Sequence, residues 1–315
     1  MKELKILAVV VFFSLAVYIL VEPIAHGVMH KTIDKQGFAY KDLPDVNKKG
    51  DATRGKDLVM GAGACTGCHS IEVAGIAPTM DALTASSSYG VVPPDLSIAG
   101  AIYDERFLHA LIKNPAKALD VEHKFTPDSG KMHPMSSFGG AGGDIDQEIA
   151  DMVAYLKSIA PDSASVTPTQ AFENACGRCH EVRYTNWTQM GEKPKFKKER
   201  DSLIYDANVL DYQDNLKKYM GKLPPDLSMK YGARGEQFMS TFVENPQGLL
   251  HGTSMPRVGL NAESAEKTLQ YLHDSYEPQA MREERDRTGL WVMGFLLILA
   301  SVAYLWKREV WKDLH

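Results

Sequence analysis

The chain has 315 residues, of which 44% are hydrophobic and 24% charged, and its formal net charge is −5. This composition is too apolar for an intrinsically disordered protein, and the acidic balance excludes a typical nucleic-acid-binding surface. The length allows two or three domains.

An apolar run at residues 6–21 follows Lys2 and Lys5 near the beginning of the chain. Such a run is typical of both a cleavable signal peptide and a membrane anchor. Pro23 follows the run, where cleavage would require small residues. We therefore expect a retained transmembrane signal-anchor over residues 4–25.

The pentapeptide Cys-x-x-Cys-His occurs twice and uses every cysteine of the chain: Cys65, Cys68, His69, Cys176, Cys179 and His180. This is the attachment pattern of c-type haem, in which each thiol adds to a porphyrin vinyl group and the histidine is the proximal iron ligand. A zinc site or a redox dithiol would also use a Cys-x-x-Cys pair. The two closing histidines, with no cysteine left over, favour two haems.

Both motifs open copies of one internal repeat. Each is followed by Pro-Pro-Asp-Leu-Ser, by Phe-x6-Asn-Pro, by a methionine four residues before a glycine, and by Tyr-Leu. These landmarks begin at Pro93, Phe107, Met135 and Tyr155 in the first copy and at Pro224, Phe238, Met255 and Tyr271 in the second. Five landmarks in the same order, counting the motif, indicate a duplication.

Helices are the expected elements of each copy, so the predicted fold class is all-α. A short helix carrying the cysteine motif is expected at residues 50–65 and 167–176, and a closing helix at residues 146–160 and 262–276, where apolar residues recur at spacings of three and four. The Phe-x6-Asn-Pro stretches are also predicted to be helical. The small, polar segment 161–168 is typical of an interdomain linker.

An insertion separates His180 from Pro224 in the second copy. It contains a basic run at residues 193–200, which we expect to be a solvated loop. The Tyr- and Asp-rich stretch at residues 205–219 has no chemistry that the sequence assigns.

Residues 288–306 carry no charge, whereas charged residues crowd both sides of them. This pattern predicts a second transmembrane helix. Because positive residues favour the cytoplasmic side, Lys5 and Lys307 predict that both termini are cytoplasmic. The region between the spans then lies in the periplasm of a bacterial inner membrane, where haem is attached to Cys-x-x-Cys-His motifs.

The two copies resemble class I cytochrome c domains, which implies tandem domains at residues 45–160 and 165–280 with two covalently bound haem c groups. In the family a methionine is the second axial ligand, and its thioether stabilises ferrous iron. The resemblance implies Met255, which follows Gly-Thr-Ser and precedes Pro256, as this ligand in the second domain.

The first domain offers three candidates for the same position: Met132, His133 and Met135. The register between the two copies selects Met135, opposite Met255. Met135 lacks the proline that follows the ligand in the usual motif. A histidine ligand would lower the reduction potential of this haem, so the choice of ligand affects the direction of electron flow.

The end of the chain, residues 306–314, resembles the tail of the cytochrome c subunit of cytochrome bc1 complexes. A two-haem chain with an added N-terminal hydrophobic segment is similar to the subunit of Epsilonproteobacteria and to that of actinobacterial complexes. This resemblance implies an electron-transfer subunit of a quinol:cytochrome c oxidoreductase, with no substrate catalysis by this chain alone. The implied partners are cytochrome b, a Rieske iron–sulfur protein that delivers the electron, membrane lipid, and a downstream cytochrome c or terminal oxidase.

Two other interpretations remain. A diheme subunit of a cbb-type haem–copper oxidase would receive electrons without a Rieske protein, but that family normally anchors from its N-terminal side. An electron-transfer subunit of a periplasmic dehydrogenase, or a diheme peroxidase, is the second. A peroxidase needs one haem with a displaceable sixth ligand, which two methionine ligands argue against.

Overall fold

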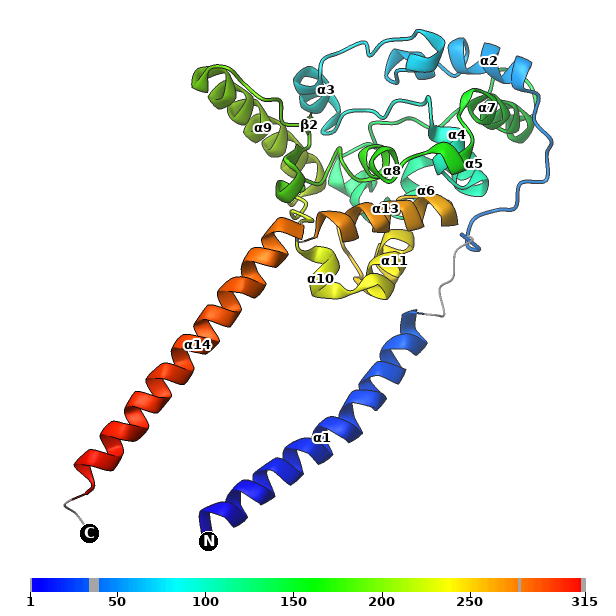
Figure 1. Cartoon of the computed structure of the whole chain (residues 1–315). Coiled ribbons are helices and arrows are strands. Elements are labelled where there is room, and N and C mark those ends of the chain that lie inside the picture. Colours follow the sequence, from blue (N-terminus) through cyan, green and yellow to red (C-terminus); the bar gives the residue numbers. More distant parts are fainter. Residues whose placement is uncertain (1, 34–39, 277–278, 313–315) are drawn as a thin grey trace.

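The computed structural model describes residues 2–33, 40–276 and 279–312. Two long helices, α1 (Lys2–Ile33) and α14 (Gln279–Val310), extend from the same side of a globular part that holds the other elements (Figure 1). The segments Lys5–Ala25 and Glu284–Val310 are long and apolar enough to cross a membrane, and their apolar windows are unburied. The far ends of both helices lie on the same side of the molecule.

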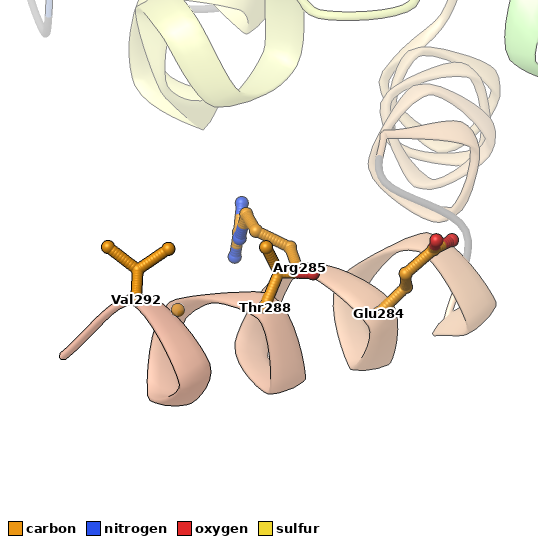
Figure 2. Close-up of a pocket in the computed structure, with 5 residues that line it drawn as sticks. Glu284, Arg285, Thr288 and Val292 are labelled. Carbon is orange, nitrogen blue, oxygen red and sulfur yellow. The ribbon is translucent and has the colours of Figure 1, made fainter. Parts of the chain in front are cut away.

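Figure 2 shows where α14 changes from polar to apolar. An open hollow of about 520 Å³ lies along one face of the helix and is lined by Glu284, Arg285, Thr288, Gly289 and Val292. The apolar segment thus begins within two turns of the last charged residues.

The described globular part is mostly helical. Its α-helices are α2 (Ala52–Met60), α3 (Ala82–Tyr89), α4 (Ala99–Ile102), α5 (Glu105–Lys113), α6 (Pro115–Ala118), α7 (Ile145–Ile159), α8 (Pro168–Ala175), α9 (Glu199–Met220), α10 (Lys230–Arg234), α11 (Glu236–Glu244), α12 (Pro246–Leu249) and α13 (Ala262–Ser275). Its 3-10 turns are η1 (Cys65–Gly67), η2 (Glu72–Ala74), η3 (Glu122–Lys124), η4 (Pro127–Ser129), η5 (Ser163–Ser165) and η6 (Arg183–Thr185). One antiparallel hairpin, β1 (Trp187–Thr188) with β2 (Gly191–Glu192), was not expected from the sequence.

The first repeat is built on the crossing of α2 and α7. A Cβ at Gly55 of α2 would lie 1.9 Å from the carbonyl oxygen of Asp151, so only glycine allows the two backbones to come this close. Buried Leu58 and Val59 of α2 and Ile149 and Met152 of α7 form the core at this crossing. Burying such side chains stabilises the fold by about 1.5–3 kcal/mol each.

The second repeat contains the equivalent crossing of α8 and α13. Thr167 begins α8 with a capping box, in which its side chain bonds the N–H of Gln170 and the Gln170 side chain bonds the Thr167 N–H. The rings of Phe172 and Tyr271 stack with centroids 4.2 Å apart. The same helix pair therefore organises both copies.

The two repeats pack into one body through backbone hydrogen bonds and a shared core. Tyr103 pairs with Leu260 in an antiparallel bridge, and the N–H of Asp104 donates to the carbonyl of Gly259 at 2.9 Å. Gly259 has φ +80°, and a Cβ there would lie 2.1 Å from the Phe107 ring. Gly90 of the first repeat meets Tyr219 of the second in the same way, at 2.2 Å. Each repeat thus presents a glycine against an aromatic ring of the other.

Two local expectations need correction. In the first repeat the helix does not carry the cysteine motif, because α2 ends at Met60 and Gly61 leaves the helical conformation. The segment 161–168 joins the two repeats, and Ser163 of its turn η5 contacts both of them. The basic run is not wholly a loop, because Glu199 and Arg200 already belong to the 22-residue helix α9.

Candidate functional site

Both cysteine motifs form the same tight turn. In each, the carbonyl of the first cysteine accepts hydrogen bonds from the N–H groups of the second cysteine and of the histidine. The N···O distances are 3.1 and 2.8 Å at Cys65, and 3.0 and 2.9 Å at Cys176. The turn gathers two thiols and an imidazole within five residues, the set that a covalently attached haem requires.

The two histidines are oriented by identical contacts. Nδ1 of His69 donates to the carbonyl of Pro94 at 2.8 Å, and Nδ1 of His180 donates to the carbonyl of Pro225 at 2.8 Å. With Nδ1 carrying the proton, Nε2 keeps a lone pair for a metal. Burial is the main cause that lowers the pKa of both histidines, so the neutral form that binds iron is favoured.

The four cysteines form no disulfide. Burial raises the pKa of Cys65 to about 11 and that of Cys176 to about 12. Such thiols lack the depressed pKa of a redox dithiol. Nor do the described residues contain a group of three or more His, Cys, Asp or Glu side chains arranged to hold a metal ion. The donor set therefore fits haem c better than zinc.

A cavity of about 320 Å³ lies between the two motifs. The first repeat contributes Cys68, Tyr89, Pro93 and Pro94 to its lining, and the second contributes Gly177, Arg178 and Trp187. A Cβ at Gly177 would lie 2.7 Å from the indole of Trp187. The two attachment sites thus face a common space, one side of which is closed by an aromatic ring.

The two predicted methionine ligands lie in irregular loops that share a local contact. The N–H of Met255 donates to Oγ1 of Thr253 at 3.4 Å, and the N–H of Met135 donates to Nδ1 of His133 at 3.2 Å. In both loops, the side chain two residues earlier bonds the methionine backbone. Both methionines are half-buried.

The three candidates of the first repeat differ in exposure. Met132 is 90% exposed, so its side chain lies on the surface of the molecule. Nδ1 of His133 is engaged with the backbone of Met135, but its Nε2 is buried and has no hydrogen-bond partner within the part described. Met135 stays the predicted ligand, with His133 as the alternative whose ring nitrogen faces the interior.

Three further residues of the second repeat have side chains that can bind iron, namely Met229, Met239 and His251. Met239 is 6% exposed and belongs to the hydrophobic core, whereas Met229 is 58% exposed. His251 lies on the surface. These positions agree with packing or solvent-facing roles.

Sequence reasoning missed two residues that join the motifs, Arg178 and Tyr212. Arg178 is an internal residue of the second motif, and its Nη1 donates to the carbonyl of Val92 in the first repeat at 2.9 Å. Tyr212 is fully buried on α9 and bonds both Val92 and Arg178. The spacing of buried residues on α9, at Val209, Tyr212, Leu216 and Met220, was a helical signal in the sequence.

In both repeats, two thiols and an oriented histidine thus lie beside a crossed helix pair. The family model described as "Cytochrome c" matches residues 52–160, which are the first repeat. These residues form a cytochrome c domain, which implies covalently bound haem c.

Comparison with particular proteins gives a more specific likeness. The chain is similar to cytochrome c1 of Allochromatium vinosum, with 23% identity over 199 residues, covering 46% of this chain and 82% of that protein. It is also similar to a solved chain of a hyperthermophilic respiratory Complex III, with 25% identity, covering 47% of this chain and 75% of that one, at a TM-score of 0.33.

Proposed function

We propose that this chain is a membrane-anchored cytochrome c with two haems that transfers electrons as a cytochrome c1-like subunit of a bc1 complex. The observation that carries the two-haem part is the repeated contact between histidine and proline, 2.8 Å in each copy. A degenerate second copy that binds no metal gives no reason to preserve the orientation of His180. Cys65 and Cys68 would attach one haem, and Cys176 and Cys179 the other.

The chain's own residues would hold and tune these haems. His69 and His180 would bind the irons through Nε2, and Met135 and Met255 would supply the opposite ligands. The bound haem supplies reversible one-electron chemistry, for which two strong axial ligands leave no open position for a substrate. Outer-sphere electron transfer is therefore the chemistry that this site supports.

Both membrane segments support an anchored arrangement. The helices α1 and α14 leave the same side of the globular part, and Lys5 and Lys307 would face the cytoplasm. The haem domains would then lie in the periplasm of a bacterial inner membrane. In Figure 1 the second repeat, with α10, α11 and α13, lies nearer to the anchors than the first repeat does.

The place in a complex rests on similarity to cytochrome c1 together with the C-terminal anchor. Cytochrome b and a Rieske iron–sulfur protein would be the partners, and the Rieske protein would reduce one haem. The other haem would pass the electron to a periplasmic cytochrome c or a terminal oxidase. Two haems in one chain would make this a variant of the subunit, similar to that of Epsilonproteobacteria. In this chain the second domain would take the place of a mobile cytochrome c.

The decisive experiment is purification of the full chain from its native membrane in mild detergent. Partners are identified by mass, and haem is counted by its reduced pyridine spectrum. We expect two haems per chain, co-purifying cytochrome b and Rieske protein, and antimycin-sensitive quinol oxidation. Co-purification of a copper-containing oxidase subunit without a Rieske protein would overturn the assignment. The chain would then be the electron-accepting subunit of a haem–copper oxidase.

A further inference from the structure

Three hydrogen bonds form a closed circuit between the two repeats. The N–H of Val92 donates to Oη of Tyr212 at 3.1 Å, and Oη of Tyr212 donates to the carbonyl of Arg178 at 3.0 Å. Nη1 of Arg178 returns to the carbonyl of Val92 at 2.9 Å. Val92 thereby has both of its backbone groups satisfied by the second repeat.

This circuit joins the supports of both candidate irons. Val92 lies two residues before Pro94, whose carbonyl orients His69. Arg178 lies between Cys176 and Cys179, the attachment residues of the second site. Val92 and Arg178 are 86 residues apart in the chain. The hydrogen bonds therefore connect the two sites by a much shorter path than the backbone does.

Arg178 also brings a positive charge that forms no ion pair within the described residues. Its guanidinium donates to the carbonyls of Val92 and Asn174 and interacts with the phenol of Tyr103. Alongside Cys68, it lines the cavity between the motifs.

The first motif has no counterpart of this cation. The residue at the equivalent position is Gly67, and a Cβ built there would meet nothing within 4 Å. The first site therefore has room for a side chain at this position but carries none. Of the two motifs, only the second places a charged side chain in the cavity, whose lining also includes Glu72, Asp95 and Glu173.

We propose that Arg178 is a positioning residue that couples the two haems, holding the second attachment motif against the loop that supports His69 and placing a fixed positive charge between them. The inference rests on the two haems of the proposed function. A cation favours the ferrous over the ferric state because the ferrous haem carries one positive charge less. Haems held at Cys65/Cys68/His69 and at Cys176/Cys179/His180 would exchange one electron, ferrous to ferric, with no bond broken.

The test uses the purified full chain and three substitutions, with haem content, the potentials of both haems and the interhaem electron-transfer rate after a light pulse as readouts. Arg178→Gln removes the charge, Arg178→Lys keeps the charge but loses the planar donor, and Tyr212→Phe opens the circuit while leaving the charge. Arg183→Gln is the matched control, since Arg183 is 72% exposed and ion-paired with Glu181.

We expect Arg178→Gln to keep both haems and to lower the potential of at least one. At a fixed poise its ferric to ferrous ratio should rise at least threefold, or about 28 mV for a one-electron couple. Arg178→Lys should retain the potentials, Tyr212→Phe should slow interhaem transfer severalfold without shifting them, and Arg183→Gln should change neither.

Two results would overturn the inference in distinguishable ways. Two attached haems with unchanged potentials and rates in Arg178→Gln and Tyr212→Phe would refute the coupling and leave the proposed function standing. A single haem on the wild-type chain would refute the two-haem function and the coupling with it.

Discussion

The Met255 loop of the second repeat and the Met135 loop of the first share a local contact but are held by different parts of the molecule. Arg257, two residues after Met255, is 5% exposed and donates its N–H to the carbonyl of Leu119 at 2.9 Å. Its guanidinium pairs with Asp42 at 2.8 Å. Leu119 and Asp42 both lie outside the second repeat.

A second cation strengthens this attachment. Nζ of Lys124, in the first repeat, donates to Oγ of Ser254 at 2.6 Å and to the carbonyl of Met220. The residues on both sides of Met255 are therefore fixed by side chains or carbonyls that belong elsewhere in the chain.

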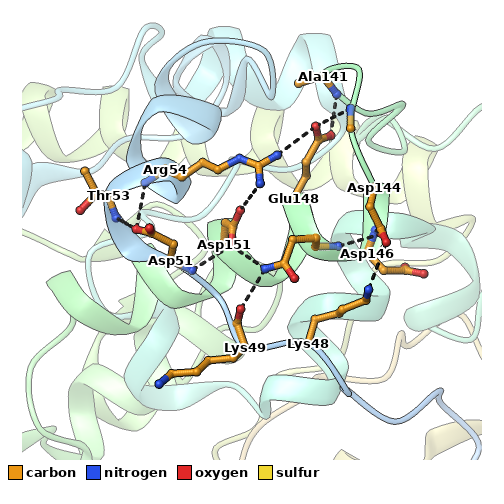
Figure 3. Close-up of polar contacts among 12 residues, drawn as sticks. Lys48, Lys49, Asp51, Thr53, Arg54, Ala141, Asp144, Asp146, Glu148 and Asp151 are labelled. Carbon is orange, nitrogen blue, oxygen red and sulfur yellow. Dashed lines mark hydrogen bonds and ion pairs between the residues drawn. The ribbon is translucent and has the colours of Figure 1, made fainter.

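The first repeat holds its own loop. Glu148 of α7 has a side chain only 2% exposed, and it accepts the N–H groups of Ala141 at 2.6 Å and Gly143 at 2.9 Å (Figure 3). Arg54 of α2 lies 3.5 Å from the same carboxylate and 3.3 Å from Asp151. The first repeat thus fixes residues 141–143, after Met135, with its own side chains, whereas the residues beside Met255 are held by the first repeat.

The largest test of this asymmetry removes one attachment site at a time. The double substitution of Cys176 and Cys179 by serine should halve the haem per chain and leave the absorption spectrum of the first haem unchanged. The double substitution of Cys65 and Cys68 by serine should halve the haem and also weaken Met255 ligation, because the first repeat supports that loop. Spectra and haem counts of the two variants check this, and equal effects would contradict the asymmetry.

The methionines themselves are the next test. Replacing Met255 with leucine should remove the thioether bond, abolish one methionine-to-iron charge-transfer band and lower one potential by on the order of 0.1–0.3 V. Met135→Leu should do the same to the other haem. His133→Leu is the comparison variant, and loss of the ligand in His133→Leu but not in Met135→Leu would identify His133 instead.

Smaller effects should separate the two supports. Glu148→Gln should cost about 1.5–3 kcal/mol of stability, because a buried charged acceptor of two backbone N–H groups is lost. Arg257→Met should cost only about 1 kcal/mol, since Asp42 stays solvated, but should loosen the Met255 ligand first. Denaturant unfolding followed at the charge-transfer bands measures the stability and the ligand loss of each variant. Loss of the Met135 ligand before the Met255 ligand in Arg257→Met would contradict the proposed difference between the two loops.

The smallest effect is a pH dependence. Burial raises the pKa of Tyr212 to about 12, above the value of about 10 expected in the unfolded chain. The phenol's contribution to stability is therefore complete below pH 10 and is lost as the pH rises toward 12. In Tyr212→Phe the free energy of unfolding should depend less on pH in this alkaline range. Denaturant unfolding at several pH values, alongside an ultraviolet phenolate titration, measures this.

Local patterns explain why much of the fold was predictable. In both repeats the Asn-Pro pair ends one helix and begins the next, since Asn114 caps α6 through the N–H of Lys117 and Asn245 caps α12 through the N–H of Gly248. A proline at the first helical position fits because it has no N–H to satisfy. These signals lie within a few residues of one another and are visible in sequence.

Long-range contacts explain what could not be predicted. The partner of Tyr212 is Val92, 120 residues away, and that of Arg257 is Asp42, 215 residues away. Periodicity can place Tyr212 on the buried face of a helix but does not say which element covers it. Arg178 was unrecognised because the motif leaves its two middle positions open.

The burial of Cys176 bears on the biogenesis of the protein. Its thiol is part of the hydrophobic core, with Phe172 and Leu269, and Trp187 closes over the neighbouring Gly177. Cys68 in the first motif is exposed. Under the proposed two-haem function, attachment at Cys176 would have to come before that core closes, so that a chain which folds too early would exclude its second haem.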